Sequence, residues 1–155
     1  MSDAASNYLE NKLLDHSLRY STAPYTGAAT VYCALFAGTF DPTVKTALES
    51  GSSAATSTNW GFHEINNASY ARQAITFGSA AASGSISSTA TVTFPVASAD
   101  YNNTATSGST VTALAIMDAS TAGNVLFYGA LTVSKQVSSG DQFTISTGNL
   151  TIQLA

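Results

Sequence analysis

The stretch QAITFGSAAASGSISSTATVTFPVASA, residues 73–99, contains no charged side chain and mixes apolar residues with small polar ones. In TVTFPV, residues 91–96, the apolar residues fall at every second position, which is the period of a half-buried antiparallel strand. The central Gly and Ser residues are typical of a turn. We therefore predict two short strands and a turn. We expect no membrane helix, because the sequence has no run of about 18 apolar residues.

The same kind of pattern extends over most of the chain. Apolar and β-branched segments separated by turn residues predict strands at Ala29–Ala37, Arg72–Phe77, Ala90–Val96, Thr110–Met117, Val125–Thr132 and Gln142–Leu154. Strands at this spacing, without helices between them, indicate a sandwich or a jelly roll. The predicted fold class is mainly β: an antiparallel β-sandwich or jelly-roll-like domain with one N-terminal α-helix.

Residues 1–22 are predicted to form an N-terminal helical arm. The helix is expected to run from about Asn7 to Tyr20. Asn7 is a plausible N-cap, and Glu10, three residues later, completes the pattern of a capping box.

The apolar residues of this helix fall on two lines about 140° apart when each residue turns the helix by about 100°. Leu9, Leu13 and Tyr20 form one line, and Leu14 and Leu18 form the other. This spread is wider than the apolar stripe of about 100° that a surface helix needs. Two interpretations stay open: a helix deep in its own core, or a helix that packs on its own domain on one side and on a neighbouring chain on the other.

Residues 23–155 are predicted to form a single β domain with a long loop at about 38–67. The subsegment ESGSSAATSTN, residues 49–59, has the composition of a flexible loop. The end of the loop carries Trp60 and Phe62, with Tyr70 and Arg72 shortly after it. Such residues dominate protein interfaces. Alternatively, Trp60 and Phe62 dock the loop on its own core, or Trp60 stacks with Tyr70 on a sugar.

The helix and the segment after the loop together supply the candidate interface. The residues predicted to contact another protein are Tyr8, Leu9, Leu13, Leu14, Leu18, Trp60, Phe62, Tyr70 and Arg72.

Charge and cysteine content exclude several classes of function. Charged residues make up 9% of the 155 residues, against about 25% in ordinary soluble domains. The five Lys and Arg residues are scattered and the net charge is −4, so nucleic-acid binding is not expected.

The N-terminus lacks the pattern of a secretory signal peptide. Cys33, the single cysteine, lies in an apolar run and is expected to be a buried thiol.

The sequence predicts no catalytic residue, no cofactor and no metal site. His63-Glu64 begins a metalloprotease-like motif, but Asn67 stands where the second histidine is needed. A glycosidase needs two carboxylates at one cleft. Glu64 with Asp41 or Asp118 would be the pair, but turn or cap roles fit these residues better. The sequence therefore favours a protein that is not an enzyme.

Five segments resemble a family of small tailed-bacteriophage proteins that are usually labelled tail fibre proteins. They are YLENKLLDHSLR (8–19), PYTGAATVYCALF (24–36), NNASYARQAITF (66–77), VTALAIMDASTAGNVLFYGALT (111–132) and GDQFTISTGNLTIQL (140–154). No single motif is diagnostic, but their order and spacing are distinctive. The resemblance implies a non-enzymatic virion component with a β-rich fold, made in the host cytoplasm.

The residues favour a location on the capsid over one in the tail. A fibre shaft is expected to show repeats, and none is present. We therefore expect a capsid cement or decoration protein on the capsid exterior. It would bind the major capsid protein, form a homo-oligomer through its helix and stabilise the assembled head. The alternative is a tail fibre or baseplate component involved in host attachment, with a host-surface glycan as a partner.

Overall fold

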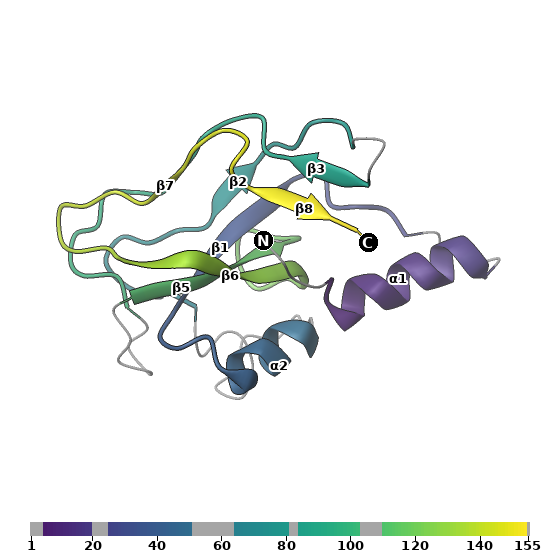
Figure 1. Cartoon of the computed structure of the whole chain (residues 1–155), viewed down its shortest axis with the longest axis horizontal. Helices are drawn as coiled ribbons and strands as arrows, with labels where there is room; N and C mark the ends of the chain where they lie inside the picture. Colours follow the sequence, from purple (N-terminus) through teal and green to yellow (C-terminus); the bar gives the residue numbers. More distant parts are fainter. Residues whose placement is uncertain (1–4, 20–24, 51–63, 81–83, 103–109, 155) are drawn as a thin grey trace.

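The computed structural model describes residues 5–19, 25–50, 64–80, 84–102 and 110–154 (Figure 1). Its central element is an antiparallel four-stranded sheet with the order β2-β1-β5-β6. The four strands are β1 (Val31–Ala37), β2 (Gln73–Ile75), β5 (Thr110–Met117) and β6 (Val125–Gln136).

Two further pairs of antiparallel strands lie outside this sheet. Strand β3 (Ser85–Ser87) pairs with β8 (Thr151–Gln153), and β4 (Val92–Thr93) pairs with β7 (Thr144–Ile145). The prediction of a mainly β chain with antiparallel pairing is confirmed. A sandwich or jelly roll is not confirmed, because the strands outside the four-stranded sheet form two separate pairs instead of one second sheet.

Helix α1 (Asn7–Leu18) forms at the predicted place, but the predicted cap is wrong. The N-cap is Ser6, whose Oγ accepts a hydrogen bond from the backbone N–H of Leu9 at 3.3 Å. The same hydroxyl donates to the carbonyl of Val125 in β6, and the Ser6 N–H donates to the Leu126 carbonyl at 2.9 Å. Ser6 therefore caps the helix and joins it to the edge of the sheet, a tertiary role that a local pattern does not reveal.

A second helix, α2 (Pro42–Ser50), lies within the loop predicted at about 38–67, so residues 42–50 correct that prediction, while residues 51–63 lie outside the described residues. The carboxylate of Asp41 caps α2, accepting hydrogen bonds from the N–H groups of Thr43 at 2.9 Å and Val44 at 3.0 Å. Pro42 occupies the first helical position, where its missing N–H costs nothing. Val44 and Leu48, one turn apart, are the buried residues of α2.

The two faces of the four-stranded sheet carry separate apolar clusters. Cys33 and Leu35 of β1 belong to the larger cluster, with residues of α1 and of the two strand pairs. Ala34 and Phe36 belong to the smaller cluster, which α2 covers. Because alternate side chains of a strand point to opposite faces, burial on both sides explains why β1 is an unbroken apolar run.

The C-terminal strand predicted at Gln142–Leu154 is two short strands, β7 and β8. Between them Gly148 adopts a φ of +80° and donates a hydrogen bond to the Ser88 carbonyl at 2.9 Å. A positive φ favours glycine and breaks the strand. Strand β3 was not predicted, because Ser85-Ile86-Ser87 has one apolar residue and resembles the turn before it.

Candidate functional site

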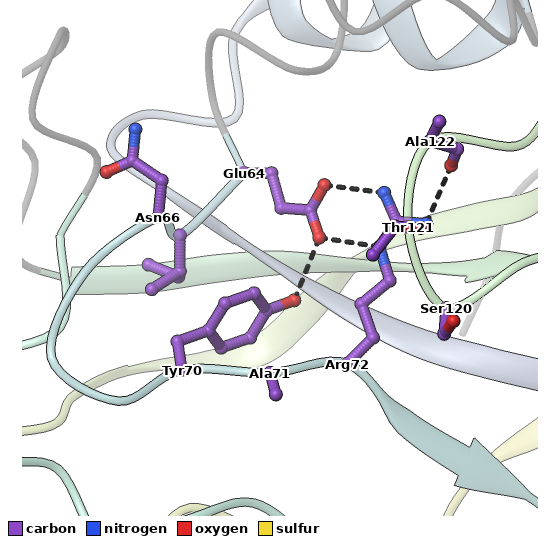
Figure 2. Close-up of a pocket in the computed structure, with 9 residues that line it drawn as sticks. Glu64, Asn66, Tyr70, Ala71, Arg72, Ser120, Thr121 and Ala122 are labelled. Atoms are coloured by element: carbon purple, nitrogen blue, oxygen red, sulfur yellow. Dashed lines mark hydrogen bonds and ion pairs between the residues drawn. The ribbon is translucent and has the colours of Figure 1, made fainter.

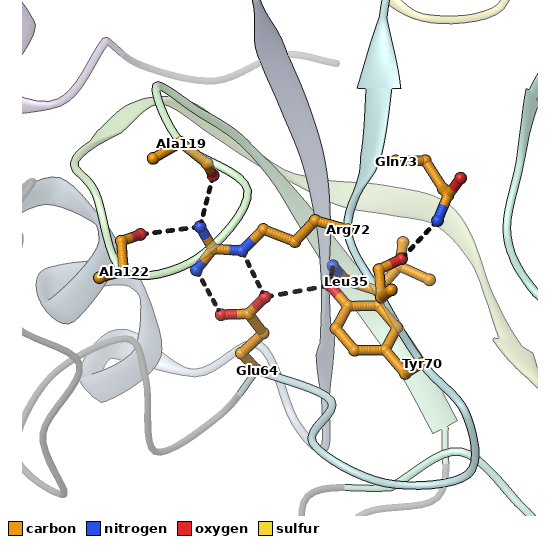
Figure 3. Close-up of polar contacts among 8 residues, drawn as sticks. Leu35, Glu64, Tyr70, Arg72, Gln73, Ala119 and Ala122 are labelled. Atoms are coloured by element: carbon orange, nitrogen blue, oxygen red, sulfur yellow. Dashed lines mark hydrogen bonds and ion pairs between the residues drawn. The ribbon is translucent and has the colours of Figure 1, made fainter.

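Arg72 and Glu64 form a buried ion pair next to the central strand β1 (Figure 3). Arg72 Nε donates to Glu64 Oε1 at 2.7 Å, and Nη2 donates to Oε2 at 2.8 Å. Their side chains are 4% and 12% exposed. Glu64 is positioned by an isolated antiparallel bridge to Phe36 of β1. The two-point geometry suits the planar guanidinium, which matches a carboxylate with two parallel hydrogen bonds.

The same guanidinium holds the turn between β5 and β6. Its Nη1 donates to the carbonyls of Ala119 at 2.8 Å and Ala122 at 2.7 Å. Within this turn, Asp118 accepts hydrogen bonds from the backbone N–H of Asn124 at 2.6 Å and from its side-chain amide at 2.7 Å. Arg72 therefore connects the segment before β2 to a turn about 50 residues later in the chain.

Tyr70 completes this hydrogen-bond network by joining the ion pair to strand β1. Its hydroxyl donates to Glu64 Oε1 at 3.1 Å and accepts from the backbone N–H of Leu35 at 3.0 Å. Its ring stacks on Phe94 and meets Tyr101 edge-on, with centroid distances of 5.9 Å in both cases. We name Glu64, Tyr70 and Arg72 the clamp, because together they join β1, the start of β2 and the 118–124 turn.

The surroundings of the clamp favour the neutral forms of Tyr70 and of the nearby Cys33, and the charged form of Arg72. Burial, and then the charge of Glu64, raise the pKa of Tyr70 well above its ordinary value and that of Cys33 to about 12. Burial alone would lower the pKa of Arg72, but hydrogen bonds and charge from Glu64 outweigh it and raise this pKa. The tyrosine and the cysteine therefore stay protonated at neutral pH.

A hollow of about 500 Å³ lies beside the clamp (Figure 2). Its lining mixes polar and apolar groups, with Asn66 on one side of the clamp and Ser120 and Thr121 of the turn on the other. The complete lining consists of Glu64, Ile65, Asn66, Tyr70, Ala71, Arg72, Ser120, Thr121 and Ala122. Because the clamp fixes both walls, the hollow is a built feature of the fold.

The three carboxylates considered for catalysis all have hydrogen-bonding roles in the fold. Asp41 caps α2 and Asp118 closes the β5–β6 turn, as the turn-or-cap interpretation predicted. Glu64 is held by Arg72 and Tyr70. Across the described residues, no group of three or more His, Cys, Asp or Glu side chains is placed to hold a metal ion.

The predicted interface residues of α1 separate into two groups. Leu9 is 5% exposed and lies in the larger core cluster, and Tyr8 and Leu13 pack partly against that cluster. Leu14 is 55% exposed and Leu18 is 78% exposed. The two lines of apolar residues predicted from the sequence therefore face different surroundings, one the core and the other solvent.

The predicted interface residues near the loop lie inside the molecule or outside the described part. Tyr70 and Arg72 form the clamp, with both side chains committed to contacts within the chain. Trp60 and Phe62 lie outside the described residues. No pattern in the sequence indicates the pairing of Glu64 with Arg72 or the contacts of Arg72 to the turn, because these depend on the tertiary fold.

The fold is mostly β, and the buried pair of Glu64 and Arg72 supports the architecture of the chain itself. In the part of the chain that is described, neither helix has the length and apolar character of a membrane span. The chain belongs to the podophage GP4 fiber I protein gp80 family, whose model matches residues 4–153. A comparison with curated proteins gave no match.

Family membership confirms the resemblance to phage fibre proteins and settles the class of function. The chain is a bacteriophage fibre protein, a structural component of the virion, and not an enzyme. The match favours the fibre alternative over the capsid cement protein that the residues alone predict. It also implies association with other virion proteins, whereas the expectation of the major capsid protein as partner has no support.

Proposed function

We propose that this chain is a component of a tail-associated fibre and is held there by contacts with other virion proteins. The observation that carries the proposal is the family match over residues 4–153. The clamp adds physical support, because the buried charges of Glu64 and Arg72 neutralise each other and hold the β fold together, which suits a structural protein. The low content of charged residues, 9% of the chain, suits a protein that remains in an assembly.

The test is the location of the chain in separated parts of the virion. Virions of the parent phage are disrupted, tails and heads are separated on a gradient, and the copy number of the chain is measured by quantitative mass spectrometry. The proposal predicts that the chain follows the tails and is absent from heads made without tails. If heads without tails carry the full copy number of the chain, the result would contradict the proposal and favour a capsid cement protein.

Host attachment is a second role, favoured by the hollow beside the clamp. We propose that the hollow takes a host-surface saccharide, because Ser120 and Thr121 of its lining carry hydroxyls, which can donate hydrogen bonds to sugar hydroxyls and accept them. Its volume of about 500 Å³ falls within the range of about 300–1,000 Å³ usual for small-molecule sites.

A bulky substitution at the rim tests this role. Thr121→Arg places a long side chain at the hollow, while Thr26→Arg puts the same side chain at an exposed position outside its lining. Binding of the labelled chain to host cells and to extracted surface polysaccharide is then measured. The proposal expects Thr121→Arg to lose binding and Thr26→Arg to keep it. Equal binding by both variants would exclude the hollow as the attachment site.

A further inference from the structure

The two charged groups that line the hollow are paired with each other (Figure 2). Among its lining residues only Glu64 and Arg72 carry charge. Nε and Nη2 of Arg72 donate to the two carboxylate oxygens of Glu64 at 2.7 and 2.8 Å. The side chain of Arg72 is 4% exposed and that of Glu64 is 12% exposed. A ligand in the hollow therefore meets walls whose charges already neutralise each other.

Arg72 cannot hold an anion in the hollow without losing contacts within the chain. A guanidinium binds a carboxylate or a phosphate best through two parallel hydrogen bonds, and Arg72 already forms this pair with Glu64. Its other terminal nitrogen, Nη1, donates to the carbonyls of Ala119 and Ala122. An anionic ligand would have to displace Glu64, which would leave a buried carboxylate without its cation.

Among the described residues, no other cation takes this role at the hollow. Its lining contains no further Lys or Arg. Burial lowers the pKa of Arg72, but Glu64 raises it above its ordinary value, with smaller contributions that include the charge of Asp118. Asp118, in the turn that forms one wall, thus adds a second negative charge near the site. An anionic ligand would lose its water there without gaining a counter-ion, which is unfavourable.

Uncharged groups remain for contact with a ligand. Ser120 and Thr121 are exposed residues of the lining and carry hydroxyls, which donate and accept hydrogen bonds. Ala71 and Ala122 are exposed in the same lining and add methyl groups. A sugar ring presents hydroxyls together with apolar C–H groups, so it can use both kinds of surface without forming an ion pair.

The backbone of both walls has a conformation that favours a binding role. Among the described non-glycine residues, positive φ values occur at Ala68, Ser69 and Ala122, with φ of 58°, 65° and 50°. Ala122 lines the hollow, and the other two lie between the lining residues Asn66 and Tyr70. Strained backbone of this kind persists where the surrounding structure holds it, and it clusters at ligand sites. This observation is independent of charge and supports the hollow as the site.

We propose that the hollow binds an uncharged saccharide and excludes acidic ones. The inference rests on the saccharide role proposed above and adds the class of sugar. Ser120 and Thr121 hydrogen-bond to the sugar hydroxyls, while the pair of Glu64 and Arg72 stays intact as part of the wall. Because no ion pair forms between the chain and its ligand, salt has little effect on the affinity.

The first experiment compares uncharged and acidic polysaccharide as ligands of the full chain. Surface polysaccharide extracted from the host is separated by anion exchange into an unretained fraction and a retained, acidic fraction. A portion of the acidic fraction is made uncharged by reducing its carboxylates to alcohols with carbodiimide and borohydride. Binding to the immobilised chain is measured by biolayer interferometry. At least one uncharged preparation is expected to bind, with an affinity that changes less than about twofold between about 50 and 500 mM NaCl, and the acidic fraction is expected not to bind.

Glu64→Gln tests whether the paired carboxylate excludes acidic sugars. The amide keeps the shape of the side chain but leaves the charge of Arg72 uncompensated, so the variant is expected to bind the acidic fraction at least about tenfold more tightly than wild type. Asp15→Asn is the matched control, because it makes the same change in the exposed ion pair with Arg19, and it should bind both fractions as wild type does. Circular dichroism shows whether each variant is folded. If Glu64→Gln is unfolded, the comparison of the fractions on wild type decides the inference.

Three results would overturn the inference. The first is binding of the acidic fraction to wild type that Thr121→Arg abolishes; the saccharide role would then stand, and only the class of sugar would be wrong. The second is an equal gain of acidic binding in Glu64→Gln and Asp15→Asn, which would assign the exclusion to net charge instead of to the hollow. The third is a lack of binding by every fraction, which would remove the saccharide role together with this inference. The location of the chain with tails or heads is tested separately.

Discussion

The hydroxyl of Tyr70 accepts a hydrogen bond from the backbone N–H of Leu35 at 3.0 Å. Leu35 lies just beyond the part of β1 that pairs with β2. Pairing between β1 and β2 ends at Cys33 with Gln73. Beyond that point, the Leu35 carbonyl accepts from the N–H of Ile65 at 3.0 Å. A side chain and a short bridging segment thus continue the hydrogen bonding of a central strand after its neighbour has ended.

Tyr70→Phe tests whether the hydroxyl of Tyr70 takes the place of a neighbouring strand as the hydrogen-bond partner of Leu35. The ring keeps its stacking on Phe94, but the Leu35 N–H loses its partner in a fully buried position. We expect a loss of about 1–3 kcal/mol in the free energy of unfolding, measured by urea denaturation. Tyr25→Phe, at a half-buried tyrosine, is the control and should change it by less than about 0.5 kcal/mol. Equal losses would show that the hydroxyl of Tyr70 has no special role.

Arg72→Met tests the ion pair of the clamp. The substitution leaves the Glu64 carboxylate in a buried place without its cation and removes two hydrogen bonds to the 118–124 turn. Removing one partner of a buried pair costs about 3–5 kcal/mol, which urea denaturation would detect. The control is Arg19→Met, which breaks an ion pair whose side chains are 77% and 52% exposed. That change is expected to cost well under about 1 kcal/mol, and similar losses for the two variants would contradict the assignment.

Alkaline pH is expected to destabilise the fold through Cys33 and Tyr70. In the folded chain their pKa values are raised, that of Cys33 from 9.0 to about 12 and that of Tyr70 well above 10.0. A group with a raised folded pKa contributes its full stability below its unfolded pKa and loses it as the pH rises toward the folded value. The free energy of unfolding should therefore begin to fall near pH 9, by at most about 1.4 kcal/mol per pH unit for each group.

Two variants separate these contributions when unfolding is measured in steps from about pH 8 to pH 11. Cys33→Ala should remove the part of the slope that begins near pH 9. Tyr70→Phe should remove the part that begins near pH 10. The slopes are compared instead of the absolute stabilities, because both substitutions also cost packing or hydrogen bonds. An unchanged slope in both variants would mean that other groups cause the alkaline loss.

Asp41→Ala tests the cap of the helix that was not predicted. The carboxylate accepts hydrogen bonds from Thr43 and Val44, and its negative charge lies at the positive end of the helix dipole. Loss of a cap costs about 0.5–2 kcal/mol. Glu49→Ala, near the other end of α2, is the control and should be neutral or slightly stabilising. The measurement is urea denaturation, and a neutral Asp41→Ala would exclude the capping role.

The sequence predicts an element correctly where its local pattern of apolar residues matches the burial of those residues in the fold. Strand β5 runs from Thr110 to Met117 as predicted, because its apolar residues are buried on both faces of the sheet. The separation of Leu9 from Leu14 on α1 followed from helical geometry alone. Helix α2 lacks such a pattern, because Asp41-Pro42 is also typical of a turn and Val44 and Leu48 are its only buried residues.

The clamp could not be predicted for a different reason. Glu64 and Arg72 are eight residues apart in an irregular segment, where no helical or strand period brings side chains together. The contacts of Arg72 to Ala119 and Ala122 depend on how β5 and β6 are placed relative to β2. Arg72 and Tyr70 are residue types that dominate interfaces, yet the structure uses both inside the chain.

Gly123→Ala tests the turn that Arg72 holds. Gly123 has a φ of +74°, and an added Cβ would lie 2.5 Å from Asp118 Oδ1 and 2.7 Å from Ala119 Cβ. Gly140 is a matched control, with a φ of +90° and nothing described within 4 Å of its added Cβ. Backbone strain of about 1–2 kcal/mol is expected for both alanines. Only Gly123→Ala must also move Asp118 or Ala119, so urea denaturation should show the larger loss for that variant.

The same variant reports on whether the turn and the clamp act together. Displacing Ala119 would move its carbonyl away from Arg72 Nη1, so Gly123→Ala should already remove part of what Arg72→Met removes. The double variant is then expected to lose less stability than the sum of the two single variants, by about 0.5–3 kcal/mol. Gly140→Ala combined with Arg72→Met should be additive. Additive losses in both pairs would mean that Arg72 stabilises the chain through Glu64 alone and does not hold the turn.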